Sequence, residues 1–172
     1  MDDFKLETLT DVMEQTPGIG VYRQGSAVDF QARGSSVNLQ TDGMRQLTSG
    51  WYYFTSTLYS LDDMAEIDRI EVLKGSSGLV NGAGAAGATI NLIRKRPTKE
   101  FQANVGVSAG SWNNLRADVD VGGPLNESGS LRGRLVASAA DAHTFRDHEK
   151  TNNQMLFGTL EADLAPDTLL NL

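Results

Sequence analysis

The sequence predicts an α+β region over residues 1–97, followed by an antiparallel sheet over residues 98–172. Two observations lead to this division. A glycine-rich stretch lies between two β-rich segments and ends at Pro97, and glycines in such a place indicate a tight connection between strands. After Pro97, apolar and polar residues alternate in runs of about ten, which is typical of strands that cross a membrane as a β-barrel.

The first region begins with a predicted helix over residues 8–16. Thr8 is a suitable N-cap with Asp11 at the third helical position, and Pro17 and Gly18 end the helix. Short strands are predicted over residues 19–23, 29–33 and 37–40, the last followed by a turn at Asp42 and Gly43. A second helix is predicted over residues 56–66, before strands over residues 67–73 and 88–95.

The glycine-rich stretch contains a match to the dinucleotide fingerprint G-x-G-x-x-G, from Gly82 to Gly87. That fingerprint requires a helix directly after the last glycine, because the helix N-terminus holds the pyrophosphate. Here the next residues, ATINLI, are β-branched and alternating, so they predict a strand. We therefore interpret the stretch as a structural crossover between two strands and not as a nucleotide site.

Four strands with a period of two are predicted after Pro97, and they begin near Phe101, Leu115, Leu131 and Leu156. A soluble sandwich would show the same period, but the second strand has charges on its polar face, which suits a water-filled lumen better. The connections also differ in length. The short turn at residues 111–114 is followed by connections at 123–130 and 165–167 that we expect to be periplasmic, and by a long polar loop at 140–153 that we expect to be extracellular.

Composition excludes several classes of function. The chain has 172 residues and a net charge of −7, so it lacks the basic surface that a nucleic-acid partner requires. It has no cysteine, which excludes disulfides and thiolate metal sites, and no apolar run long enough for a membrane helix. His143 and His148 fall in the predicted long loop without the spacing of a metal site. We find no catalytic constellation, and expect that the protein is not an enzyme.

The stretch RIEVLKGSSGLVNGAGAAGATINLIRKRP resembles the signature of the plug domain of TonB-dependent outer-membrane receptors, in their siderophore-receptor branch. The usual form there is similar to IEVLRGPSGLLYGSGAPGGTINLVTKRP. The segment TPGIGVYRQ and the later Arg33-Gly34 also resemble the plug, whereas Ser35 and Leu39 replace its usual aromatic residues. The resemblance implies an α+β plug domain over residues 1–97, with a mixed four-stranded sheet and short helices. Residues 98–172 would then be the first strands of a truncated transmembrane β-barrel.

The implied function is energy-coupled uptake of iron chelates across the outer membrane of a Gram-negative bacterium. The ligand would be a ferric siderophore, with no resident cofactor, and the partners would be outer-membrane lipid and the TonB energy-transducing complex. Neither a signal peptide nor the family's energy-coupling box is visible, so we expect an internal cut at the start and a fragment of a longer receptor. The alternative is a soluble secreted β-rich domain that binds a carbohydrate or polymer through Trp51, Trp112 and the tyrosines.

The resemblance also implies two groups of site residues. Arg33 and Lys74 match the basic residues that pair with barrel glutamates and lock the plug to the wall, although lysine cannot form the bidentate fork of arginine. Ligand-binding loops at the extracellular apex correspond to residues 22–28, 35–38 and 45–54. An alternative role for residues 51–54 is to pack the loop against the barrel wall. The candidate ligand-binding residues, which are cations, amides and aromatics, are Arg23, Arg45, Gln46, Trp51, Tyr52 and Tyr53.

Overall fold

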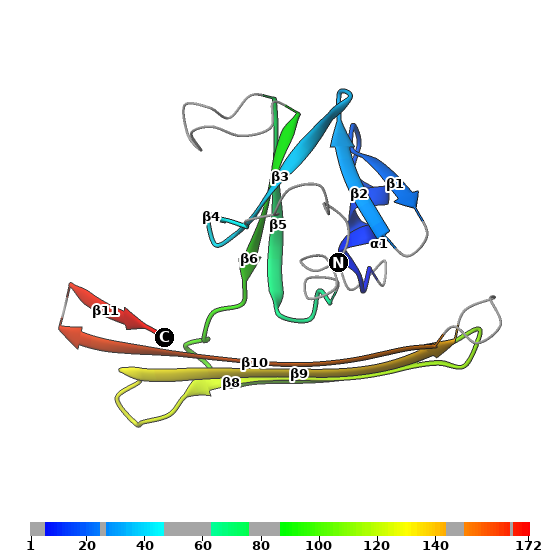
Figure 1. The fold of residues 1–172 in the computed structure, drawn as a ribbon. Coiled ribbons are helices and arrows are strands. Elements are labelled where there is room, and N and C mark those ends of the chain that lie inside the picture. Colours follow the sequence, from blue (N-terminus) through cyan, green and yellow to red (C-terminus); the bar gives the residue numbers. More distant parts are fainter. Residues whose placement is uncertain (1–5, 25–26, 47–62, 76–86, 144–149, 166) are drawn as a thin grey trace. The chain divides into compact units, whose positions relative to one another are not determined.

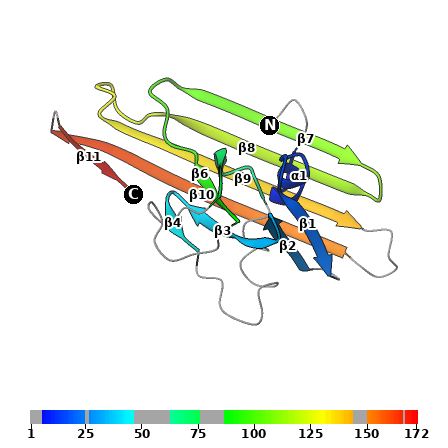
Figure 2. The same cartoon turned by 90° about the horizontal axis from the view of Figure 1, so that it is seen from above.

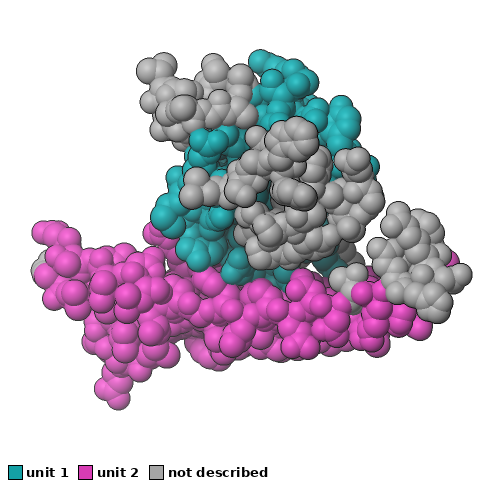
Figure 3. Space-filling model, in the orientation of Figure 1, with its two compact units in different colours: residues 1–94 teal, residues 95–172 magenta. Residues whose placement is uncertain are grey.

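The computed structural model describes residues 6–24, 27–46, 63–75, 87–143, 150–165 and 167–172. The chain forms two compact units, Met1–Arg94 and Lys95–Leu172, which Figure 3 shows in separate colours. Unit 1 contains a short helix and a mixed sheet, and unit 2 contains an antiparallel sheet (Figure 1). The division lies three residues before the Pro97 boundary that the sequence predicts.

Helix α1 (Leu9–Glu14) begins with the predicted cap. The Thr8 hydroxyl accepts a hydrogen bond from the Asp11 amide at 3.1 Å, and the Asp11 carboxylate accepts one from the Thr8 amide at 3.1 Å. This reciprocal pair satisfies two amides that a helix start leaves unpaired. Leu9 and Met13 lie one turn apart on the same face, and both are buried in the core of unit 1.

The mixed sheet of unit 1 has six strands in the described residues, whereas the family resemblance implied a sheet of four. Strands β3 and β6 are parallel, and the other neighbouring strands are antiparallel. The spatial order is β1-β2-β3-β6-β5, with β4 paired to the end of β3. Leu39, Ile90 and Leu92 extend from the central strands into the core. The strands are β1 (Gly20–Gln24), β2 (Ala27–Ala32), β3 (Ser35–Thr41), β4 (Met44–Arg45), β5 (Ile67–Lys74) and β6 (Ala88–Arg94).

Two predictions for unit 1 are wrong in the described residues. Residues 22–28 and 35–38, expected as apical loops, belong to strands where they are described: 22–24 to β1, 27–28 to β2 and 35–38 to β3. Residues 63–66, expected to end a helix, form a bridge and a turn, because Asp63 pairs with Thr8 and its carboxylate accepts a hydrogen bond from the Ala65 amide at 2.8 Å. By contrast, β6 is a strand, which confirms that the glycine-rich stretch does not lead into a nucleotide-binding helix.

In its described residues, unit 2 is a meander of five antiparallel strands, β7 to β11, in which each strand pairs with the next one in sequence (Figures 1 and 2). The fifth strand was not predicted, and β9 and β10 extend through most of the expected loop at residues 140–153. The predicted turn at residues 111–114 is present, with Trp112 and Asn113 at positive φ. The strands are β7 (Gln102–Gly110), β8 (Asn114–Pro124), β9 (Leu131–His143), β10 (Lys150–Ala165) and β11 (Thr168–Asn171).

The two faces of this sheet differ as the alternation predicts. Val105, Val119 and Leu156 lie in one row of the register, and their exposed fractions are 74%, 41% and 75%. On the other face, Asp120 and Ser138 are buried. The outward face is thus apolar and the other face is polar, which is the arrangement of strands in a transmembrane barrel. Within the described residues, α1 is too short to cross a bilayer as a helix.

Candidate functional site

One end of the mixed sheet carries both residues predicted for the lock, Arg33 and Lys74. Arg33 and Gly34 form the turn between β2 and β3, with φ values of 53° and 74°, as a type I′ hairpin requires. Lys74 ends β5 and pairs with Ala88, the first residue of β6. Both basic side chains are exposed, and neither has an ion-pair partner among the residues that the structure describes.

Gly87 joins these two positions through a close contact between backbones. A Cβ atom added to Gly87 would lie 2.6 Å from the Ala32 oxygen and 2.8 Å from the Ser35 oxygen, so only glycine fits between them. The Gly75 amide donates a hydrogen bond to the Gly87 oxygen at 3.0 Å, which ties the end of β5 to the same point. The glycine-rich connection therefore holds the Arg33 turn against the end of the strand that carries Lys74.

The predicted ligand-binding residues are only partly described. Arg23 lies in β1, where its guanidinium forms an exposed ion pair with Glu14 at 2.6 Å. Arg45 ends β4, and the Gln46 side chain donates a hydrogen bond to the Thr41 hydroxyl at 3.0 Å. Trp51, Tyr52 and Tyr53 lie outside the described residues.

The expectation that residues 35–38 and 45–54 share one end of unit 1 is also wrong. Strand β2 pairs with Ser35 and Ser36 at the start of β3, whereas β4 pairs with Gln40 and Thr41 at its end. Arg45 therefore lies at the end of β3 opposite to Ser35. A seven-residue strand separates the two positions, since the predicted loop proved to be part of that strand.

The end of the sheet near Arg45 has a polar cluster that the sequence analysis did not identify. Asp42 and Gly43 form a second turn at positive φ, between β3 and β4. The Asp42 carboxylate accepts hydrogen bonds from the Arg94 guanidinium at 2.6 Å and from the Arg94 amide at 3.0 Å. The Gly43 amide donates to the Asn91 side chain at 2.9 Å. The Asp-Gly pair is a sequence signal for the turn, but its partners on β6 are 48 and 52 residues away.

Glu66 belongs to the same end of unit 1. Its partial burial raises the pKa of its carboxyl group above the ordinary value, because burial disfavours the charged form. Arg94 opposes this shift, while the negative charges of Asp63 and Asp42 add to it. The carboxyl groups of Asp42, Asp63 and Glu66 thus lie close enough to interact at the end of the sheet that holds Arg94.

The polar face of unit 2 carries two ion clusters. The Arg134 guanidinium forms a two-pronged pair with Asp120, with both N–O distances at 2.8 Å. Lys95 adds a third bond to the same carboxylate at 2.7 Å. Arg132 forms a similar fork with Asp163, at 2.7 and 2.9 Å. The alternation along β8 predicts charges on this face, but it does not predict these partners.

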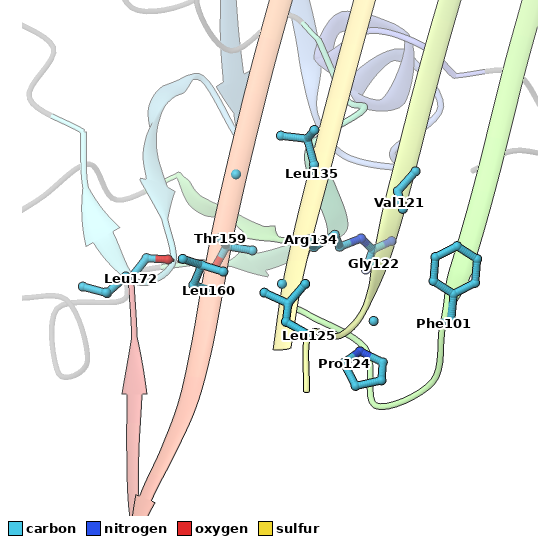
Figure 4. A pocket seen from close by; sticks show the side chains of 13 residues that line it. Phe101, Val121, Gly122, Pro124, Leu125, Arg134, Leu135, Thr159, Leu160 and Leu172 are labelled. Carbon is cyan, nitrogen blue, oxygen red and sulfur yellow. The ribbon is translucent and has the colours of Figure 1, made fainter. Parts of the chain in front are cut away.

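The apolar face of unit 2 has a hollow of about 600 Å³ near the turn that follows β8 (Figure 4). Phe101, Leu125, Leu135, Leu160 and Leu172 are among the residues that line it. An iron chelate needs polar groups that fix its orientation, and this lining is overwhelmingly hydrocarbon. The hollow therefore suits lipid chains better than the predicted ligand.

Histidine and carboxylate groups do not gather into a metal site in the part of the chain that the structure describes. His143 is the last residue of β9, not part of a loop, and its amide donates a hydrogen bond to the Trp112 oxygen at 3.1 Å. His148 lies outside the described residues.

Comparison with known proteins identifies the family. The family described as "TonB-dependent Receptor Plug Domain" matches residues 1–89, which include α1 and nearly the whole mixed sheet up to the first residues of β6. The chain belongs to the TonB-dependent receptors. This confirms the resemblance that the glycine-rich signature indicated, and it excludes the alternative of an unrelated secreted β-domain.

Similar proteins extend the match through unit 2. The ferripyoverdine receptor of Pseudomonas aeruginosa is 49% identical over 178 residues, which cover 100% of this chain and 21% of that receptor. The solved structure of the pyoverdine outer membrane receptor FpvA from the same organism, bound to pyoverdine, has a TM-score of 0.93 and 49% identity, and covers 99% of this chain and 25% of that one. The alcaligin outer membrane receptor FauA from Bordetella pertussis has a TM-score of 0.82 and 34% identity, with 96% and 28% covered.

These relatives confirm the predicted fold class of this TonB-dependent receptor: a plug followed by strands of an outer-membrane barrel. They are receptors and not enzymes. The chain spans about a fifth of the length of the curated relative. The comparisons do not test the roles of Arg33, Lys74 or the ligand-binding residues, which stay predictions.

Proposed function

We propose that the protein carrying this chain is an outer-membrane receptor that takes up a ferric siderophore with energy from the TonB complex. The observation that carries the proposal is the 49% identity with a ferripyoverdine receptor, which extends over the whole of this chain. A pyoverdine is therefore the first siderophore to test. The outer membrane of a Gram-negative bacterium is the location of the family and of the relatives named above.

The described residues support a mechanism with two separate tasks in the plug. The end of the sheet with Arg33 and Lys74 presents two exposed cations, on a turn and a strand end that both lie next to Gly87. Two such cations can pair with carboxylates of a barrel wall and hold the plug in place. The second task, contact with the chelate, falls to predicted ligand-binding residues that include Trp51 and Tyr53, since aromatic side chains combine a flat apolar surface with a polar edge.

The iron would arrive already bound by the siderophore, so the protein has to recognise the outside of the chelate. Binding would shift the plug to a state that the energy-transducing complex can loosen. The coupling partner would act on a segment that precedes the signature strands in the family. The ferric siderophore is cargo in this scheme, and no resident cofactor is required.

Uptake by cells that lack their own ferric-siderophore receptors tests the proposal. Such cells, expressing the full-length protein, should accumulate radioactive iron from ferripyoverdine, and removal of TonB should abolish the accumulation. A matched culture that expresses an unrelated outer-membrane barrel gives the background. If normal amounts of receptor in the outer membrane take up neither ferripyoverdine nor any other ferric siderophore, the proposal is wrong.

A further inference from the structure

The chain passes from one unit to the other between two adjacent basic residues with different partners. Arg94, the last residue of unit 1, pairs with Asp42 at 2.6 Å inside that unit. Lys95, the first residue of unit 2, pairs with Asp120 on β8 at 2.7 Å. Each side of the boundary is thus fixed to its own unit by an ion pair.

The segment after the boundary has no ladder pairing. Strand β6 ends at Arg94 and β7 begins at Gln102, so residues 95–101 belong to neither strand. Polar bonds attach the start of this segment to unit 2. Lys95 reaches Asp120, and the Arg96 oxygen accepts a hydrogen bond from Arg134 at 3.0 Å.

Two glycines of β8 allow the rest of the segment to approach closely. A Cβ atom added to Gly122 would lie 3.1 Å from the Thr98 hydroxyl, and one added to Gly123 would lie 2.9 Å from the Cα atom of Phe101. Glycine at such places in a strand marks a close approach of another backbone. Residues 95–101 therefore lie close to the end of β8, with Lys95 bonded to Asp120 of β8, Arg96 bonded to Arg134 of β9, and Thr98 and Phe101 close to the two glycines.

Asp120 is the centre of this attachment. Its side chain is only 10% exposed, and it accepts three hydrogen bonds, two from the Arg134 fork and one from Lys95. Charge-assisted bonds to a buried carboxylate are stronger than exposed pairs, because water competes with them less. The Lys95 side chain, 22% exposed, is also shielded, unlike the Arg94–Asp42 pair, whose side chains are 40% and 32% exposed.

We propose that Asp120 is an anchor that keeps residues 95–101 fixed to the sheet of unit 2 when unit 1 is displaced or unfolded. A pulling force applied to the plug would then be resisted at Lys95 and would not be transmitted along the chain to β7. In the proposed uptake cycle, the anchor would limit how far along the chain the structure loosens. The plug can loosen while β7, the first strand of the wall, keeps its pairing with β8. The contacts of Asp120 carry this inference, and only its place in an uptake cycle rests on the proposed function.

Pulling on the N-terminus of the full-length receptor in a membrane tests the anchor directly. In the native receptor, extension should pause once unit 1 has unfolded, and residues 95–101 should leave the wall in a separate, later step. Seven residues at 3.3–3.6 Å each correspond to roughly 25 Å of added length. In Asp120→Asn and Lys95→Gln that separate step should be lost or should occur at a lower force.

The choice of variants keeps the result interpretable. Lys95→Gln leaves the Arg134–Asp120 fork intact, so it should fold even if Asp120→Asn does not. Asp118→Asn is the matched control, because Asp118 lies on the same face of β8 but its ion pair with Arg116 is long, at 3.8 Å. Its trace should equal that of the native receptor.

Identical traces in the native receptor and Lys95→Gln would overturn the proposal, as would a native trace without the separate step. The pulling experiment needs no siderophore. A receptor that shows the step but takes up no ferric siderophore would refute the proposed function and leave the anchor standing.

Discussion

The close contact at Gly87 predicts that Gly87→Ala destabilises unit 1 in the full-length receptor. The new Cβ atom would lie 2.6, 2.8 and 3.0 Å from the backbone oxygens of Ala32, Ser35 and Ser36. These atoms are backbone and not the end of a flexible side chain, so the strands themselves must move. Overpacking of this kind typically costs about 1–3 kcal/mol.

The size of the expected change follows from the size of the unit. A change of 1 kcal/mol shifts the melting temperature of a domain of 60–100 residues by about 4–8 °C. Unit 1 extends from Met1 to Arg94, which is in this range, so Gly87→Ala should lower its transition by at least about 4 °C. Calorimetry of the purified receptor, which separates the transitions of the two units, gives the measurement.

Gly20→Ala is the control for this experiment. Its Cβ atom would lie 3.2 Å from the ring of Tyr22, but that ring is 56% exposed and can turn away. The expected cost is within about 0.5 kcal/mol, as for other surface substitutions. A transition of Gly87→Ala that equals the native one, or equals that of Gly20→Ala, would refute the close approach of the glycine-rich connection to the Arg33 turn.

Four further substitutions test other parts of the receptor. Val119→Arg places a charge on the apolar face, at a cost of about 2–4 kcal/mol near the bilayer centre, and should lower the amount of folded barrel in the outer membrane; normal amounts would count against that face. Lys74→Arg allows a second charge-assisted hydrogen bond in the proposed lock, worth about 1.5–3 kcal/mol, and should raise the transition of unit 1; no rise would argue against a carboxylate partner. Trp51→Ala should weaken ferripyoverdine binding roughly thirtyfold at normal abundance, whereas lower abundance with native affinity would indicate a packing role. The raised pKa of Glu66 means that folding favours its protonated form, so the stability of unit 1 should fall as pH rises from 4.5 through the raised pKa. Glu66→Gln should remove this part of the pH dependence when the transition is measured by calorimetry over a range of pH. An unchanged pH profile would contradict the prediction.

Features with a local signal could be predicted from the sequence. The capping box of α1 depends on two residues three positions apart, and the alternation of β7 and β8 is visible within each strand. The glycine-rich signature predicted β5 and β6 because both flanks are β-branched. In each case neighbouring residues contain the whole pattern.

Features that depend on long-range pairing were missed. Strand β11 is only four residues long, which is too short for its own sequence to show an alternating pattern. Its ladder with β10 makes it a strand. Strands β9 and β10 continue to His143 and from Lys150 because they pair with each other residue by residue, although their outer parts are polar. A polar stretch predicts a loop when it is considered alone, whereas a partner strand satisfies its backbone and makes it a strand.

The candidate site shows the same limit. Arg33 and Lys74 could be named from a motif, but the contact that brings their strands together involves backbone oxygens and Gly87, which no pattern of side chains reports. The expected apical grouping of residues 35–38 with Arg45 was wrong for a related reason. The turn is complete at Arg33 and Gly34, so residues 35–38 already belong to β3, and this strand separates them from Arg45.

Arg94 and Lys95 illustrate what decides the boundary between the two units. They are adjacent, both basic, and both at the end of the same β-rich segment, so their own chemistry does not distinguish them. Arg94 pairs with Asp42, which lies 52 residues earlier, and Lys95 pairs with Asp120, which lies 25 residues later. The boundary is therefore set by partners and not by the residues at the boundary. A substitution at Asp42 should consequently release Arg94 from unit 1, and one at Asp120 should release Lys95 from unit 2, even though neither carboxylate lies near the boundary in sequence.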